Sequence, residues 1–148
     1  MTDEPLSQCE FEAENLILRL DLCVPGEVSA VSPVVRQIMT VIQETGCAAG
    51  KEFEVEVALQ EALANAVVHG CKEDPEKQVQ ISVACDENRG MLVVIRDPGS
   101  GFDASDLPSP VEGQQLYRDH GRGVFLINRL MDEVRYEHGG REIWMRKG

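Results

Sequence analysis

The stretch EALANAVVHG, residues 61–70, is the second half of the clearest helix that the sequence predicts, Phe53–Gly70. At about 100° per residue, the apolar side chains of this segment fall on one helix face, and Gly70 ends the helix. A polar stripe follows the edge of the apolar face at helical spacing, and its members are Glu61, Asn65 and His69. We therefore expect an amphipathic helix that packs on the core and presents polar side chains at the core's edge.

The elements around this helix predict the fold class. Alternating or continuous apolar runs indicate strands at Leu16–Leu22, Val79–Cys85, Met91–Ile95, Val134–Glu137 and Glu142–Arg146. Two further helices are expected, one from Ser32 to Gly46 and one after Gly123. The order β-α-α-β-β-loop-α-β-β predicts an α+β two-layer sandwich, in which helices lie on one face of a mixed sheet.

Net charge narrows the classes of partner. The chain has 148 residues, with 26 acidic and 14 basic side chains and a net charge of −12. A surface this acidic repels nucleic acid and anionic membrane, so we expect no direct binding to either. The charge suits a soluble protein with basic or neutral partners, although solubility alone is the simpler explanation.

Cysteine usage and hydropathy favour a cytoplasmic location. The five cysteines are odd in number and show no C-x-x-C spacing, so neither a disulfide framework nor a zinc site is expected. No run reaches the roughly 18 consecutive apolar residues of a membrane span. The first residues are acidic and polar, unlike a signal peptide. We expect a flexible tail over residues 1–13 and a single domain over residues 14–148.

The polar stripe supplies the first candidate chemistry. Asn65 offers a neutral oxygen of the kind that Mg²⁺ accepts beside water and phosphate oxygens. Glu61, one turn earlier, could orient or deprotonate an attacking hydroxyl group. The simpler alternative is a solvated helix face that happens to carry E-x-x-x-N. His69 could equally be a residue at the helix C-terminus that interacts with the helix dipole.

A second motif, DPGSG at residues 97–101, follows an apolar strand. Asp97 could accept a hydrogen bond from an exocyclic amine such as that of adenine, and Gly99 and Gly101 would let a flat ligand approach the backbone. The alternative is an ordinary Asp/Gly turn. A calcium-binding loop is excluded, because its twelfth position needs a bidentate Glu and is occupied by Pro108.

A third motif, HGRGVF at residues 120–125, precedes the last predicted helix. Glycines at a helix start leave backbone N–H groups free to bind phosphate, and Arg118 and Arg122 could add positive charge. A plain glycine-rich helix start is the alternative, since neither a Walker nor a Rossmann sequence occurs. The polar stretch before the motif, residues 104–120, indicates a functional loop.

Together the motifs resemble those of the GHKL superfamily, which joins gyrase-type ATPases and histidine kinases. EALANAVVHG is similar to its N box, and DPGSG is similar to its first glycine box. GRGVFLINRLMDEV, residues 121–134, resembles the second glycine box in the form found in bacterial anti-sigma factor serine kinases of the partner-switching type. The resemblance covers about residues 14–147 and implies the GHKL, or Bergerat, fold with ATP and Mg²⁺ as cofactors.

The resemblance also implies roles for individual residues. Glu61 would be the general base, Asn65 the Mg²⁺ ligand and Asp97 the residue that reads the adenine amine. Residues 103–120 would form an ATP lid. The other nucleotide-binding residues would be His69, Gly99, Gly101, Arg118, Gly121, Arg122, Gly123 and Val124, and Arg36 would meet a protein partner.

We therefore interpret the chain as a Mg-ATP-dependent protein serine/threonine kinase. The resemblance implies that it phosphorylates a STAS-domain anti-anti-sigma protein, sequesters an RNA polymerase sigma factor and can form a homodimer. A nucleotide-gated binding switch with little or no kinase activity is the alternative, because a switch could retain Glu61 and Asn65. A third interpretation is the catalytic domain of a histidine kinase from a longer chain.

Overall fold

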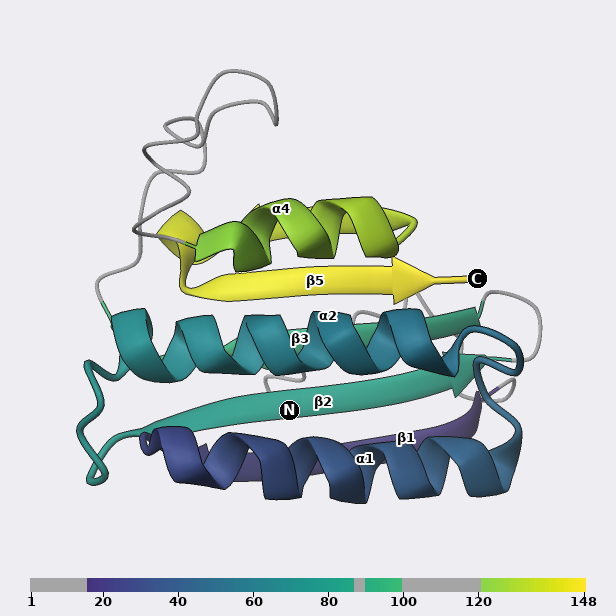
Figure 1. Cartoon of the computed structure of the whole chain (residues 1–148), viewed down its shortest axis with the longest axis horizontal. Helices are drawn as coiled ribbons and strands as arrows, with labels where there is room; N and C mark the ends of the chain where they lie inside the picture. The colour runs from purple at the N-terminus through teal and green to yellow at the C-terminus, as the bar shows by residue number, and fades with distance from the viewer. Residues whose placement is uncertain (1–15, 87–89, 100–120) are drawn as a thin grey trace, which may run out of the picture.

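A computed structural model describes residues 16–86, 90–99 and 121–148, so the predicted tail over residues 1–13 lies outside it. Within these residues one sheet carries three helices side by side on one face (Figure 1), which confirms the predicted two-layer α+β class. The helices are α1 (Val31–Thr45), α2 (Glu52–Asn65) and α4 (Gly121–Leu130). The strands are β1 (Leu16–Pro25), β2 (Gln78–Asp86), β3 (Gly90–Arg96), β4 (Glu133–Glu137) and β5 (Glu142–Lys147). Short turns of helix are η2 (Val28–Ala30), η3 (Ala66–Gly70) and η5 (His138–Gly140).

The sheet differs from the prediction in one respect, because it is antiparallel and not mixed. Its strand order is β1-β2-β3-β5-β4, and every pairing among the described strands is antiparallel. Two helices, α1 and α2, separate β1 from β2, so the chain reverses direction three times and re-enters the sheet antiparallel to β1. The connection through α4 does bring β4 parallel to β3, but β5 lies between these two strands.

The core lies between the sheet and the inward faces of the helices. Ile38 and Ile42 of α1 and Leu59 and Leu63 of α2 are completely buried. They pack on alternate residues of the central strands, such as Val93, which is also 0% exposed. This burial, at roughly 1.5–3 kcal/mol per large apolar side chain, holds α2 in the middle of the helical layer. No helix in the described residues is long and apolar enough to cross a membrane.

A disulfide joins the two layers, so the expectation of unpaired cysteines is wrong for one pair. Cys47, in the turn between α1 and α2, is bonded to Cys85 near the end of β2, with a Cα–Cα distance of 6.2 Å. Both side chains are 3% exposed. Cys23 and Cys71 are free. Spacing along the chain could not reveal this pair, because its partners are 38 residues apart and meet only after the helices have packed on the sheet.

Removal of this cross-link should lower the stability of the oxidised protein. Closure of a 38-residue loop restricts the unfolded chain, so a Cys47→Ser/Cys85→Ser variant should lose about 4 kcal/mol of unfolding free energy. Guanidinium unfolding with and without a reductant measures the loss. The reductant should destabilise the wild type and leave the double variant unchanged, and Cys23→Ser should behave as the wild type. A wild type that is insensitive to reductant would contradict the cross-link.

Candidate functional site

Glu61 and Asn65 occupy the last two turns of α2. Both side chains are partly exposed, whereas Ala62 and Leu63 between them face the core at 4% and 0% exposure. The spacing of four residues in a regular α-helix places Glu61 and Asn65 on the same side. Helix packing therefore holds a carboxylate and an amide next to each other at the edge of the apolar face of α2, as the sequence predicts.

His69 follows in a different kind of turn. After Asn65 the helix widens into the π-helical turn η3, in which the N–H of Cys71 donates to the carbonyl oxygen of Ala66 at 2.9 Å. A π turn holds more residues than an α turn. His69 is exposed. Glu61 and Asn65 therefore lie in regular α-helix, and His69 lies in the wider turn that follows them.

Asp97 is fixed at the end of β3 by bonds to β5. The N–H of Asp97 donates to the carbonyl oxygen of Arg141 at 2.8 Å. In the preceding residue, Arg96 Nε donates to Oε2 of the buried Glu142 at 2.6 Å. The Asp97 Oδ1 atom accepts a hydrogen bond from the Gly99 N–H at 2.8 Å. These contacts hold a half-buried carboxyl group at the end of the central strand. The backbone that follows carries no side chain at Gly99.

Burial raises the pKa of Asp97, although the hydrogen bond from Gly99 and the positive charge of Arg141 act against this rise. Cys71, immediately after η3, is completely buried. Burial and the neighbouring carboxylate of Asp97 raise its pKa. The end of η3 and the end of β3 therefore form one desolvated corner of the protein.

Two glycines make this corner possible. A Cβ atom on Gly70 would lie 2.3 Å from Cγ of Asp97, and a Cβ atom on Gly99 would lie 2.6 Å from the carbonyl oxygen of Gly70. Both distances are too short for any side chain. The first two sequence motifs thus meet through Gly70, Asp97 and Gly99. From the sequence, Gly70 is predicted only to end the helix, and its contact with Asp97 is not predicted. Its place in the first motif, directly after His69, is the signal that could have indicated a role in the site.

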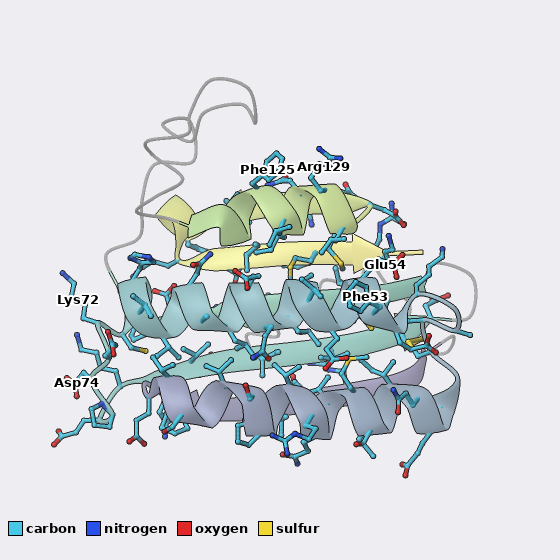
Figure 2. The ribbon with its side chains drawn as sticks, viewed as in Figure 1. Phe53, Glu54, Lys72, Asp74, Phe125 and Arg129 are labelled. Carbon is cyan, nitrogen blue, oxygen red and sulfur yellow. A yellow bond between two sulfur atoms is a disulfide. The ribbon has the colours of Figure 1, made fainter. Side chains whose placement is uncertain are left out.

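The turn after η3 supports the same corner from the other side. Figure 2 shows Lys72 and Asp74 on this turn, at the end of the helical layer. The N–H of Glu73 donates to the carbonyl oxygen of Val67 at 3.0 Å, and the N–H of Gly26 donates to that of Lys77 at 2.9 Å. These bonds tie the turn to η3 and to the end of β1. No residue of this turn is among the site residues that the sequence predicts.

The third motif is helical from its first glycine. The sequence predicts a turn at Gly121–Gly123 and a helix after it, but α4 begins at Gly121, so Gly121, Arg122, Gly123 and Val124 form its first turn. The first four N–H groups of a helix lack partners within it, so the predicted phosphate-binding groups would be those of the first turn of α4. Gly101, Arg118 and the predicted lid over residues 103–120 lie outside the described residues.

Arg36 is not part of this group. It is exposed on α1, one helical turn after Ser32, whose hydroxyl oxygen accepts a hydrogen bond from Nε2 of Gln60 at 2.7 Å. That contact places this face of α1 beside α2. Arg36 therefore lies on the outer surface of the helical layer, apart from the corner at Asp97.

The described residues contain no preformed cluster of metal-binding side chains. Among them, no group of three or more His, Cys, Asp or Glu side chains is arranged to hold a metal. The corner holds a hydrogen-bond acceptor, Asp97, packed against the backbone of Gly70 and Gly99. Its carboxyl oxygens could accept a hydrogen bond from an amine. An ion such as Mg²⁺ would take an oxygen from Asn65 and others from phosphate and water.

The raised pKa of Asp97 should make its carboxylate destabilising at neutral pH. The native state binds this proton more tightly than the unfolded chain, so the destabilisation is present above the raised pKa and disappears as the pH falls through it. Asp97→Asn should therefore be more stable than the wild type at neutral pH, and the difference should shrink in acid. Urea unfolding over a pH series measures it.

Asp132 provides a control of opposite sign. The hydrogen bond from the Gly148 N–H lowers the pKa of Asp132, so its carboxylate contributes stability that is lost as the pH falls through the lowered pKa. Asp132→Asn should be the less stable protein at neutral pH, and this difference should also shrink in acid. If both substitutions changed the free energy of unfolding in the same direction at neutral pH, this result would contradict the buried environment assigned to Asp97.

Gly70→Ala should displace Asp97. The added methyl group cannot share space with the Asp97 side chain, and overpacking of this kind costs about 1–3 kcal/mol. A double-mutant cycle with Asp97→Ala tests the cause, because removal of the carboxyl group relieves the closest contact. Gly70→Ala should cost less free energy of unfolding in the Asp97→Ala background. An equal cost in both backgrounds would place the strain elsewhere.

Comparison with known proteins places the chain in a family. Residues 24–147 match the model of the histidine kinase-like ATPase domain. The chain is 30% identical to the serine-protein kinase RsbW of Bacillus subtilis (strain 168) over 135 residues, which are 86% of this chain and 84% of that protein. It is 27% identical to the RsbW protein of Bacillus cereus (strain AH187) over 126 residues, 81% of this chain and 78% of that protein. The chain therefore belongs to the histidine kinase-like ATPase domain family.

Proposed function

We propose that this protein is a Mg-ATP-dependent protein serine/threonine kinase. The observation that carries the proposal is the placement of Glu61 and Asn65 one turn apart on α2, followed directly by the Gly70–Asp97 corner. The Glu61 carboxylate and the Asn65 amide oxygen therefore lie on the same helical segment that ends against Asp97, the proposed acceptor for a planar base. The similar proteins from Bacillus species are named serine-protein kinases, which supports the same chemistry for this chain.

The Asp97 corner is the proposed adenine site. The Asp97 carboxylate would accept a hydrogen bond from the adenine 6-amino group, while its Oδ1 atom also accepts from Gly99. Gly70 and Gly99 hold the Asp97 carboxyl group in this position, because a Cβ atom on Gly70 would overlap Asp97 and one on Gly99 would overlap the backbone of Gly70. From the sequence alone, Gly101 is assigned to the same site.

The phosphate end of the nucleotide would lie between α2 and α4. Asn65 would hold Mg²⁺ through its amide oxygen, and His69 would approach the nucleotide from η3. The free N–H groups in the first turn of α4 would bind the phosphates, helped by the helix dipole. This turn comprises Gly121, Arg122, Gly123 and Val124, and Arg118 is added from the sequence alone.

Glu61 would act on the protein substrate. ATP supplies the phosphoryl group. The Glu61 carboxylate would accept the proton of a serine or threonine hydroxyl group as its oxygen forms the new O–P bond, and the bond between the β–γ bridging oxygen and the γ-phosphorus breaks. The products are the phosphorylated protein, ADP and a proton. Helix packing keeps the carboxylate in place and partly exposed to an incoming substrate.

The proposed partners follow from the serine kinases that the chain resembles. The substrate would be a STAS-domain anti-anti-sigma protein, and the chain would also sequester an RNA polymerase sigma factor. Arg36, exposed on α1 beside α2, is the proposed partner contact. A homodimer is part of the same proposal. The net charge of −12 favours a basic surface on the captured partner.

Glu61→Gln should slow phosphoryl transfer about 10²–10⁴-fold, because the amide cannot accept the hydroxyl proton. Nucleotide affinity should change little, since the proposed adenine and Mg²⁺ contacts remain. Transfer from labelled ATP to purified STAS-domain proteins measures the first quantity, and binding of a fluorescent ATP analogue measures the second. Glu44→Gln, an exposed carboxylate at the end of α1, is the matched control and should retain full activity. The kinase proposal fails if the wild type labels none of these substrates.

A further inference from the structure

The middle helix of the layer exposes a large aromatic side chain on its outer side. Inward-facing Val55 and Leu59 are completely buried. The outward positions, spaced by three or four residues, begin at Phe53 and continue through Val57, Gln60, Ala64 and Val68. Phe53 is 73% exposed and Val68 is 37% exposed. A large aromatic side chain is normally buried, but the described residues that pack on α2 leave Phe53 exposed.

The outward faces of the neighbouring helices are different. The exposed residues of α1 are polar or are proline: Ser32, Pro33, Arg36, Gln37, Thr40, Gln43, Glu44 and Thr45. On α4, the one large aromatic side chain, Phe125, is half-buried, and the guanidinium group of Arg129 lies 5.5 Å from the centre of its ring. Figure 2 shows this pair along the edge of the molecule, whereas Phe53 and Glu54 lie together at the start of α2 on the front of the layer. Phe53 is thus the most exposed large apolar side chain among the described residues.

Carboxylates surround Phe53. Glu52, Glu54 and Glu56 flank it in sequence, and Glu56 is exposed on the second turn. Glu52 and Glu54 also stabilise the N-terminus of α2 through the helix dipole, but this does not account for an exposed phenylalanine or for Glu56. The neighbouring cation, Lys51, donates a hydrogen bond to the carbonyl oxygen of Gly148. We define the Phe53 surface as Phe53, Val57, Glu52, Glu54 and Glu56.

We propose that the Phe53 surface is a docking site for a basic amphipathic helix of a partner protein. An apolar side chain of such a helix would cover Phe53, and its lysine or arginine side chains would face the three carboxylates. A second copy of this chain would instead bring like charges together, and an anionic membrane would be repelled by the same carboxylates. The surface lies at the N-terminal end of α2, whereas Glu61 and Asn65 lie toward its C-terminal end, so docking does not depend on the proposed kinase chemistry.

A labelled helical peptide of leucine and lysine, with its leucines on one face, is the probe. Fluorescence anisotropy gives its Kd for the full chain. Phe53→Ser should weaken binding about 10- to 100-fold, the factor expected for loss of one buried aromatic contact. Glu56→Lys should weaken it several-fold and reduce its salt dependence. A peptide in which glutamate replaces lysine should not bind.

Matched controls separate this site from diffuse attraction to an acidic protein. Val28→Ser removes another exposed apolar side chain, 50% exposed on η2, and Glu137→Lys reverses an exposed carboxylate on β4. Both should leave the Kd within about twofold of the wild type, because each is an isolated surface substitution outside the Phe53 surface and such substitutions have small effects. If Glu137→Lys weakens binding as much as Glu56→Lys, the attraction is diffuse and the proposal is overturned.

Two further readouts keep the result independent of folding and of the kinase proposal. Circular dichroism and the unfolding midpoint of Phe53→Ser should match the wild type, because the ring is mostly exposed. Phosphoryl transfer should also be unchanged, so loss of peptide binding with full activity supports the docking site alone. If Phe53→Ser shifts sedimentation from dimer to monomer and leaves the peptide Kd unchanged, the surface is a self-interface and the proposal is overturned.

Discussion

The contact between Gly70 and Asp97 is the constraint on which the site depends. It joins the end of the helical segment α2–η3 to the end of β3, with no room for even a methyl group between them. Because Asp97 is also bonded to β5 through the carbonyl oxygen of Arg141, the helical layer and the sheet are registered against each other at this point. The same contact helps to fix the positions of Glu61 and Asn65, because both residues lie on α2, the helix that leads into η3 and Gly70.

Periodicity predicted the strands, the helices and the two-layer class, because these depend on which side chains face the core. It failed where the deciding contact is tertiary or purely backbone. The widening of the helix after Asn65 is set by hydrogen bonds such as that from Cys71 to Ala66, and no side-chain pattern marks it. The antiparallel sheet follows from the number of helices between β1 and β2, which the sequence shows, and from the insertion of β5 beside β3, which it does not. The motifs named Asp97 and Gly99, but only packing shows that Gly70 belongs with them.

The site illustrates a conflict between stability and function. Burial raises the pKa of Asp97, so its ionised form disfavours the folded state at neutral pH. An asparagine would avoid that cost, but it would offer a weaker acceptor to an amine than a carboxylate does. A carboxyl group retained in a desolvated corner, next to two glycines that weaken the local backbone, is expected where a ligand must be bound and is unexpected where only packing matters.

The helix α2 carries three separate constraints on its three sides. Its inward residues, such as Leu59 and Leu63, are fixed by the core, and Glu61 and Asn65 are fixed by the proposed chemistry at the edge. Neither the core nor the proposed chemistry constrains its outward residues, so these could be polar, like the exposed residues of α1. Phe53 is nevertheless apolar, although its exposure favours aggregation and the protein would fold equally well with a polar residue at this position. An apolar residue that neither the core nor the site requires is best explained by a third contact, which the carboxylates on either side restrict to a basic partner.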